Sequence, residues 1–215
     1  MKKVLGIFVL VSTALVFFCC KGNGGGSSSS GSTNSGTAPA TVATFAANFN
    51  INYAIEVNTN TDTAAFRATL SGIDLVSESH SCSFSGTFDN GTLSFTGGST
   101  ITITNGSFNL NTGDGNHTFT KTSSTANTAT YSCTIPGSYV LAFKNNNTYT
   151  MTGTGYLAGE SDSGVYSITS GDFNNGTIVI DGDTCTITNG SFGNTIPVED
   201  ANGTTQNLTV TFVKQ

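Results

Sequence analysis

The sequence predicts an all-β fold, an antiparallel β-meander sandwich or barrel built from two tandem repeats of about 85 residues each. The main observation is that the stretch Gly86–Phe108 occurs again as Gly171–Phe192, with 14 identities among 22 aligned pairs when one gap is placed at Gly98. In both copies, apolar residues alternate with Thr or Ser over short runs that end at Asn-Gly or Gly-Gly pairs. Such alternation is typical of strands that are joined by tight turns.

The Asn-Gly pairs predict where the meander turns. A two-residue type I′ turn needs positive φ at both central positions, and Asn followed by Gly meets this requirement at little cost. In the first copy these turns set Phe88 opposite Leu93 and Ile103 opposite Phe108, so that apolar residues share one face of the sheet. The predicted turn pairs are Asn90-Gly91 and Asn105-Gly106 in the first copy, and Asn175-Gly176 and Asn189-Gly190 in the second.

The middle turn differs between the copies by one residue. A three-residue loop, Gly97 to Ser99, sets Phe95 opposite Ile101 in the first copy, and a two-residue loop, Gly182-Asp183, sets Ile180 opposite Cys185 in the second. The deletion therefore shortens the loop and keeps the apolar residues on the same face.

Residues 1–19 have the features of a secretory signal peptide. Two lysines, Lys2 and Lys3, precede an apolar or small run of 15 residues from Val4 to Phe18. This run is short for a membrane span, which needs about 20 residues. We therefore expect the segment to be removed and exclude it from the fold.

The run ends at Cys19-Cys20, which a polar, glycine-rich stretch follows at once. This arrangement resembles the signal and lipobox of bacterial lipoproteins. The resemblance implies a diacylglyceryl thioether on Cys20, because the residue before it, Cys19, is smaller than Phe18; Cys19 is the alternative acceptor. The family pattern has Leu at position −3, where this chain has Phe17 or, for the alternative, Val16.

Residues 20–40 form the predicted tether. Six Gly and six Ser occur among residues 21–40, and such a chain behaves as a flexible coil that spans roughly 25 Å. Residues 41–215 form the β-rich region, with repeats at 41–128 and 129–215. Two small domains in tandem and one larger unit with pseudo-two-fold symmetry both fit this pattern. The second is favoured, because only Ser123–Thr128 resembles a linker.

Charge argues against a nucleic-acid partner. Without Lys2 and Lys3 the chain has five basic and 13 acidic residues, a net charge of −8, and its basic residues are scattered. Anionic lipid would not bind such a surface, so the expected membrane contact is the acyl anchor. In diderm bacterial lipoproteins Asp after the acceptor often signals retention at the inner membrane. Lys21 stands there, so we expect the exported protein to lie at the outer membrane or cell surface. It is expected to be a monomer.

Three cysteines lie beyond the signal, at Cys82, Cys133 and Cys185, and strand alternation turns all three inward. They are expected either to be small buried residues or to form one disulfide and leave one free thiol.

The sequence predicts no catalytic residues, no metal site and no cofactor. His80 and Cys82 could share a strand face, but a nucleophilic cysteine also needs an orienting group, and a metal site needs three or four ligands. His117, the other histidine, lies in a polar loop. The loop Asn58 to Asp62 lacks the Gly and Glu of an EF-hand, with Thr63 and Thr69 in their places.

The sequence does not group the other acidic residues into one site. Asp181 to Asp183 and Asn111 to Asn116 are interpreted as turns, because Asx side chains bond their own backbone. A pair of carboxylates could serve a hydrolase, as in glycosidases, and nothing in the sequence selects among the strand-flanking candidates Glu56, Glu78, Glu160 and Asp162.

The sequence thus favours a lipid-anchored surface or envelope protein with a non-catalytic binding or structural role, its partner being a host or envelope macromolecule. The alternative is a periplasmic carrier that encloses a small apolar ligand in a β-barrel. A hydrolase built on carboxylates ranks third.

Overall fold

The computed structural model describes residues 38–112 and 115–215. The predicted signal peptide, both candidate lipidation residues, Cys19 and Cys20, and most of the predicted tether lie outside the described residues. The described part is all β and antiparallel, which confirms the predicted fold class. The strands are β1 Thr41–Asn58, β2 Thr63–Leu70, β3 Ile73–Gly86, β4 Gly91–Phe95, β5 Thr100–Ile103, β6 Ser107–Asn111, β7 Asn116–Ser124, β8 Thr128–Lys144, β9 Thr148–Gly155, β10 Ser161–Gly171, β11 Gly176–Ile180, β12 Asp183–Ile187, β13 Ser191–Glu199 and β14 Thr205–Lys214.

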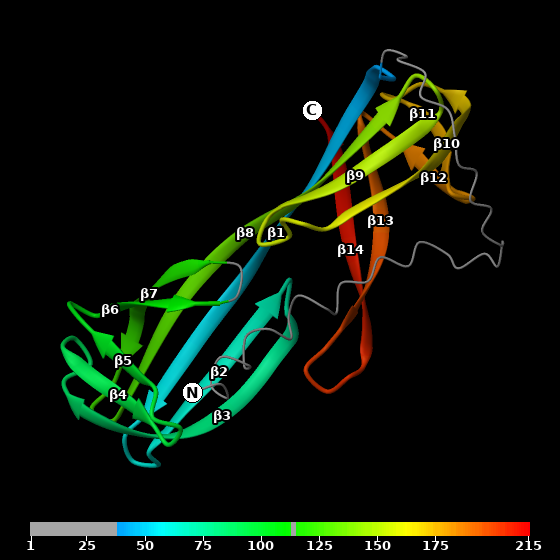
Figure 1. The fold of residues 1–215 in the computed structure, drawn as a ribbon. Helices are drawn as coiled ribbons and strands as arrows, with labels where there is room; N and C mark the ends of the chain where they lie inside the picture. The colour runs from blue at the N-terminus through cyan, green and yellow to red at the C-terminus, as the bar shows by residue number, and fades with distance from the viewer. Residues whose placement is uncertain (1–37, 113–114) are drawn as a thin grey trace.

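Two long strands, β1 and β8, form the centre of the molecule. They pair antiparallel from Thr41 opposite Lys144 to Asn58 opposite Thr128, and Figure 1 shows them running through both ends of the elongated fold. Alternate side chains of β1 are buried along its whole length, from Ala43 to Val57. This burial follows from the period of two, since every second side chain of a strand points to the same face.

The other strands form two lobes around this pair (Figure 1). The first lobe contains β2 to β7 with the C-terminal half of β1 and the N-terminal half of β8. The second lobe contains β9 to β14 with the other halves of β1 and β8. The first strand of each repeat therefore contributes to both lobes. A single cluster of buried apolar residues includes side chains from both lobes.

The sheet does not close into a barrel, so the barrel alternative is wrong. Among the described residues, β5 and β6 are bridged at Thr104 and Ser107, next to the turn that joins them, and β12 and β13 are bridged in the same way at Thr188 and Ser191. Beyond these bridges, β6 pairs with β7, and β13 pairs with β14.

The turns Asn105-Gly106 and Asn189-Gly190 are present as predicted. Asn105 has a φ of 50° and Gly106 a φ of 70°, as a type I′ turn requires. The flanking residues Thr104 and Ser107 exchange backbone hydrogen bonds of 2.8 and 3.0 Å. Asn189 and Gly190 have nearly the same angles, 50° and 71°.

The predicted two-residue turn at Asn90-Gly91 is wrong. Gly91 is the first residue of β4 and pairs with Gly86, so the loop consists of the four residues Thr87 to Asn90. In the second copy, Gly176 pairs with Gly171, and the loop is Asp172 to Asn175. Leu93 consequently faces Phe84, four residues before the predicted partner Phe88.

Gly91 is needed here because the backbone comes close to it. A Cβ on this residue would lie 2.7 Å from the carbonyl oxygens of both Ser85 and Thr87. Its partner Gly86 has a φ of 95°, which L side chains rarely adopt. The Asn-Gly pair was therefore the right signal for a turn and the wrong signal for its type.

The middle turns are also displaced, each by one residue, which moves the pairing partners by two residues. Ile101 faces Leu93 where Phe95 was predicted, and Cys185 faces Ile178 where Ile180 was predicted. The second-copy turn is Asp181-Gly182, with φ values of 49° and 100°. Because the partners move by two residues, every apolar residue stays on its predicted face.

Among the described residues, no helix has the length and hydrophobicity that a membrane span requires.

Candidate binding groove at the tip of the first lobe

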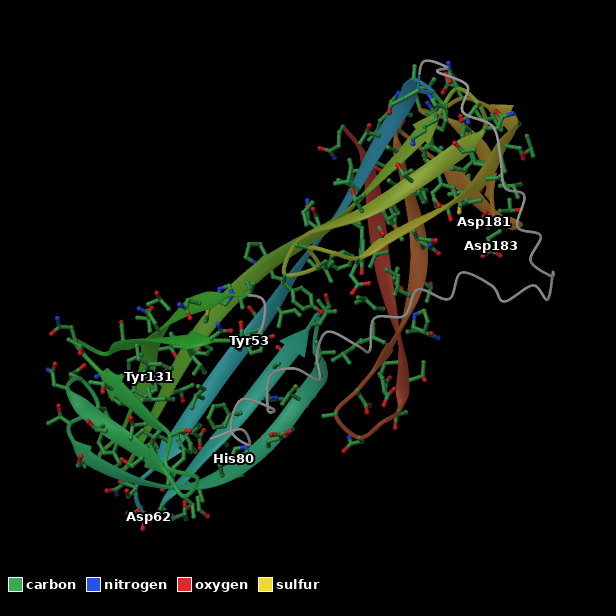
Figure 2. All side chains as sticks on the ribbon, viewed as in Figure 1. Tyr53, Asp62, His80, Tyr131, Asp181 and Asp183 are labelled. Atoms are coloured by element: carbon green, nitrogen blue, oxygen red, sulfur yellow. The ribbon has the colours of Figure 1, made fainter. Side chains whose placement is uncertain are left out.

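An open groove lies at the end of the first lobe, beside the turn that follows β1. Its volume is about 390 Å³. Figure 2 places Asp62, which belongs to this turn, at the extreme end of the first lobe. We call this feature the tip groove; its lining residues are Thr61, Asp62, Ser81, Cys82, Ser83, Ser94, Phe95 and Thr96.

Three segments build the tip groove, and hydrogen bonds to backbone carbonyl oxygens hold them together. The Cys82 N–H donates to the carbonyl oxygen of Asp62 at 2.9 Å, which joins β3 to the β1–β2 turn. The Thr96 hydroxyl donates to the carbonyl oxygen of Ser81 at 3.2 Å, which joins the β4–β5 turn to β3. The positions of the lining groups are therefore set by the sheet rather than by a long loop.

The side chains on the exposed face of the lining are hydroxyl groups and one carboxylate. Asp62 is the one formally charged residue in the lining at neutral pH, and no lysine or arginine is part of it. The half-buried Phe95 ring points to the opposite, core face, because Phe95 pairs with the buried Cys82, and it packs there against Phe66 with ring centroids 5.8 Å apart. Within the described residues, the hydroxyls of Ser83 and Ser94 have no hydrogen-bond partner, so they are available to a ligand.

The hydroxyl-rich lining belongs to the first repeat and is not copied in the second. Cys82 pairs with Phe95, and Tyr166 pairs with Ile180, so Cys82 and Tyr166 are equivalent positions. The same register makes Val179 the equivalent of Ser94, while Val165 stands where the first copy has Ser81. The two copies thus share turns and core but differ in these surface residues.

Cys82 and His80 do not form a nucleophilic pair. Burial, together with the nearby Asp62 carboxylate, raises the pKa of the Cys82 thiol, which keeps the thiol protonated. The His80 ring packs edge-on against Phe66 at 5.4 Å, and its Nε2 lies 3.2 Å from Glu78 Oε2. The histidine therefore has a carboxylate as its polar partner.

Of the two alternatives for the cysteines, the structure has the one without a disulfide among the described residues. Within residues 38–112 and 115–215, Cys82, Cys133 and Cys185 are all thiols. Each lies in a different pair of strands: Cys82 faces Phe95 in the first lobe, Cys133 faces Tyr53 on β1, and Cys185 faces Ile178 in the second lobe. Cys82 is buried, and the other two are half-buried against the core, in line with their predicted inward direction.

The polar loop Asn58 to Asp62 is the turn between β1 and β2. The Asn58 side-chain oxygen accepts a hydrogen bond of 2.9 Å from the N–H of Asn60, as in an Asx turn. Within the described part of the chain, no three His, Cys, Asp or Glu side chains are grouped as metal ligands. The loop thus shapes the edge of the tip groove.

One pair of carboxylates meets in the second lobe. The buried Tyr149 hydroxyl lies within hydrogen-bonding reach of Asp181 and 3.5 Å from Asp162. Asp181 also accepts a 3.0 Å hydrogen bond from the Val165 N–H. Gly164 allows this arrangement, because a Cβ there would collide with the Asp181 carboxylate. The cluster fastens the β11–β12 turn, where Figure 2 labels Asp181 and Asp183.

The other carboxylates singled out from the sequence are spread over the molecule. Glu56 is exposed on β1, Glu78 is paired with His80 on β3, and Glu160 lies in the β9–β10 turn. Asp162 is joined by Asp181, which the sequence had marked as a turn residue. Strand register would have been needed to foresee that pair.

A small hollow inside the first lobe has no room for a water molecule. It is lined by residues of β1 and β2 together with Val76 and Phe119, and its volume is about 0 Å³. The side chains of Tyr53 and Phe119 lie edge to face there, with centroids 6.4 Å apart. At this place the interior is filled.

A comparison with known proteins finds no matching family model, no matching curated protein and no matching solved structure.

Proposed function

We propose that this protein is a lipid-anchored, exported envelope protein that holds a non-catalytic binding surface away from the membrane. The observation that carries the proposal is the course of β1. This strand starts at Thr41, where the predicted tether ends, and stops at Asn58, beside the tip groove. At about 3.3 Å per residue, its 18 residues span on the order of 60 Å.

The pairing of β1 with β8 supports a spacer role. Each strand alone would bend, whereas the two are hydrogen-bonded to each other over their full length and carry a buried apolar face. An anchor on Cys20 would therefore leave the second lobe near the membrane and the tip groove at the far end.

The carrier and hydrolase alternatives have less support. A carrier needs an enclosed cavity, which is commonly about 300–1,000 Å³ in ligand sites, and the hollow against Tyr53 has no space. A hydrolase needs two carboxylates in a cleft. Asp162 on β10 and Asp181 in the β11–β12 turn meet at the hydroxyl of Tyr149 on β9, where both have a structural role.

Metabolic labelling with a radioactive fatty acid in a bacterial host tests the anchor. We expect the full chain and the Cys19→Ser variant to be labelled and to enter the detergent phase on phase partitioning. Cys20→Ser should be unlabelled and remain in the aqueous phase. Cys82→Ser, with its substitution in the β region, is the control and should be labelled like the original chain. Labelling of Cys20→Ser would move the acceptor to Cys19, and no labelling of the original chain would refute the anchor.

A further inference from the structure

We infer that the β13–β14 hairpin is a brace that fixes the orientation of the two lobes relative to each other. The hairpin starts in the second lobe and is bonded at its tip to the first lobe. The Ala201 N–H at the tip donates to the carbonyl oxygen of Asp74 on β3 at 2.7 Å. Figure 1 shows the orange and red hairpin extending towards the start of β3. A brace goes beyond the proposed function, because it concerns the β region and needs no lipid.

The two lobes meet at a narrow part of the sheet, which we call the waist. Within the described residues, Asn50 on β1 and Pro136 on β8 face each other and have no third strand paired beside them. Four strands lie side by side at Ala46, on the second-lobe side, and again at Ile55, on the first-lobe side. A two-stranded ribbon twists more than a wider sheet and has fewer hydrogen bonds to resist bending. The lobes would therefore bend at the waist.

The hairpin crosses the waist. At its base, β14 pairs with β1 at Ala46, on the second-lobe side of Asn50. At its tip it is bonded to Asp74, which pairs with Thr69 on β2. Thr69 in turn pairs with Asn52, on the first-lobe side of Asn50. One hairpin is thus joined to the sheet on both sides of its narrowest point.

The part that crosses the waist is an extension that the first repeat lacks. The hairpins match at the pairs Phe108–Phe119 and Phe192–Phe212. Beyond these, β6 and β7 continue for three residue pairs, whereas β13 and β14 continue for seven, so residues 196–208 are additional. The first lobe forms its turns and core without such an extension, which indicates a role between the lobes.

The extension is packed against the rest of the molecule. Ile196, Val198 and Leu208 are 1%, 1% and 5% exposed, and all three belong to the common core cluster. Among the described residues the extension is two-stranded, since β14 reaches β1 only at Val213 and Lys214. An isolated two-stranded hairpin is marginally stable at best and has no second layer to bury its side chains. Its apolar face therefore packs on the body of the protein, and bending at the waist would expose it to water.

Both partners of the tip contact are held in place by their own lobe. The Asp74 carboxylate accepts two hydrogen bonds from Arg67, at 2.7 and 2.8 Å. In the hairpin tip, the Asp200 carboxylate accepts from the N–H groups of Asn202 and Thr204, at 2.9 and 3.0 Å. Because both sides are ordered beforehand, the contact costs little further entropy.

Distances between spin labels on the two lobes test the inference. The full chain is kept in detergent micelles, and azide-bearing amino acids at Ser77 on β3 and Thr211 on β14 carry the labels, so that the native thiols stay unlabelled. Both positions are exposed and lie outside the extension. Double electron–electron resonance on the otherwise unchanged chain should give one narrow distance distribution.

Two variants release the brace. Replacing residues 196–208 by residues 112–115 gives the second hairpin the length of the first. The distance distribution should then broaden about twofold or more, because the lobes sample a range of hinge angles.

The second variant combines Val198→Ser with Ala201→Pro and should broaden the distribution in the same way. It weakens the buried face and removes the N–H that donates to Asp74. The Gly203 N–H donates to the Asp200 carbonyl at 2.9 Å, so Ala201 is the second residue of a turn, where proline is favoured. The matched control combines Glu199→Ser with Ala201→Ser, which keeps the N–H and the apolar face, and should give the narrow distribution.

Circular dichroism shows whether each variant is folded. A narrow distribution in the folded shortened chain or in the folded Val198→Ser, Ala201→Pro chain would overturn the inference. Equal broadening in the matched control, or a broad distribution before any hairpin change, would do so as well. If the shortened chain does not fold, the double variant decides. These outcomes are independent of fatty-acid labelling, so failure of the brace leaves the anchor in place, and an unlabelled chain leaves the brace in place.

Discussion

The side-chain oxygen of Asn90 accepts a 3.1 Å hydrogen bond from the backbone N–H of Asn105, which ties two turns of the meander together. The second copy repeats this contact between Asn175 and Asn189 at 3.0 Å. Each Asn-Gly turn also receives a backbone hydrogen bond from the last strand of its repeat. These bonds run from Lys121 to Gly106 and from Lys214 to Gly190, both at 2.8 Å. The best-matched part of the repeat therefore holds the turns at the end of each lobe together by hydrogen bonds.

Replacing Asn90 by Ala should destabilise the protein by about 1 kcal/mol, because the N–H of Asn105 loses its partner. Asn175→Ala should have a similar effect in the second lobe. Chemical denaturation followed by circular dichroism measures both changes. If neither variant shifts the transition midpoint, the cross-turn contact does not contribute to stability.

Gly91→Ala should be more damaging, costing about 2–3 kcal/mol, because the new methyl group would meet two carbonyl oxygens at 2.7 Å. Gly72→Ala is the control. Gly72 has a φ of 88°, and a Cβ on it would have no atom within 4 Å, so only backbone strain of about 1 kcal/mol is expected. A smaller loss at Gly91 than at Gly72, measured by urea denaturation, would contradict the crowding argument.

Asp89→Asn should change stability by less than about 1 kcal/mol. The Lys121 ammonium lies 2.5 Å from the Asp89 carboxylate, and the side chains are 22% and 60% exposed. The second copy has a neutral counterpart, since Lys214 donates to Asn174 at 2.8 Å. Asp89→Asn gives the first copy the same neutral lysine–asparagine pair. The stability of the variant should therefore depend less on salt concentration than that of the original chain. An unchanged salt dependence would show that the pair is already screened.

Stability should fall at alkaline pH through Tyr131. Burial, with a smaller effect from Asp89, raises the pKa of this tyrosine to about 12, and its hydroxyl donates to the Phe88 carbonyl at 2.7 Å. A tyrosine in the unfolded chain ionises near pH 10. The stability that protonated Tyr131 contributes to the folded state is therefore complete below pH 10 and is lost as the pH rises towards 12.

Tyr131→Phe tests this source of alkaline sensitivity. The variant should be less stable by about 1 kcal/mol at neutral pH, because the Phe88 carbonyl loses its donor. Its loss of stability between pH 10 and 12 should be smaller than that of the original chain. Melting temperatures recorded across this range give the comparison, and parallel curves for both proteins would exclude Tyr131 as the cause.

Reducing agent should not alter the melting temperature, because the three cysteines of the β region are thiols. Non-reducing peptide mass mapping gives a direct check on the same material. A linked pair of peptides containing any two of Cys82, Cys133 and Cys185, together with a lower melting temperature after reduction, would contradict the structure.

The alternation of apolar and hydroxylated residues was sufficient to predict the fold class and the face of each side chain. This is why the displacement of Ile101 and Cys185 by two residues left their faces unchanged. Asn105-Gly106 was predicted correctly because a type I′ turn depends on the conformational preferences of two adjacent residues. The Asn90-Gly91 turn was not, because its form depends on the approach of Ser85 and Thr87 to Gly91.

The sequence by itself determined the repeat, the alternation of each strand and the hydroxyl-rich character of the surface, because these depend on neighbouring residues. The tertiary structure decided which strands meet. Pairing of β1 with β8 joins residues such as Ile51 and Ile135, and the tip groove brings Asp62, Ser83 and Ser94 together from three segments. Such pairings come from competition among many strands of similar composition, and burying the common core selects among them.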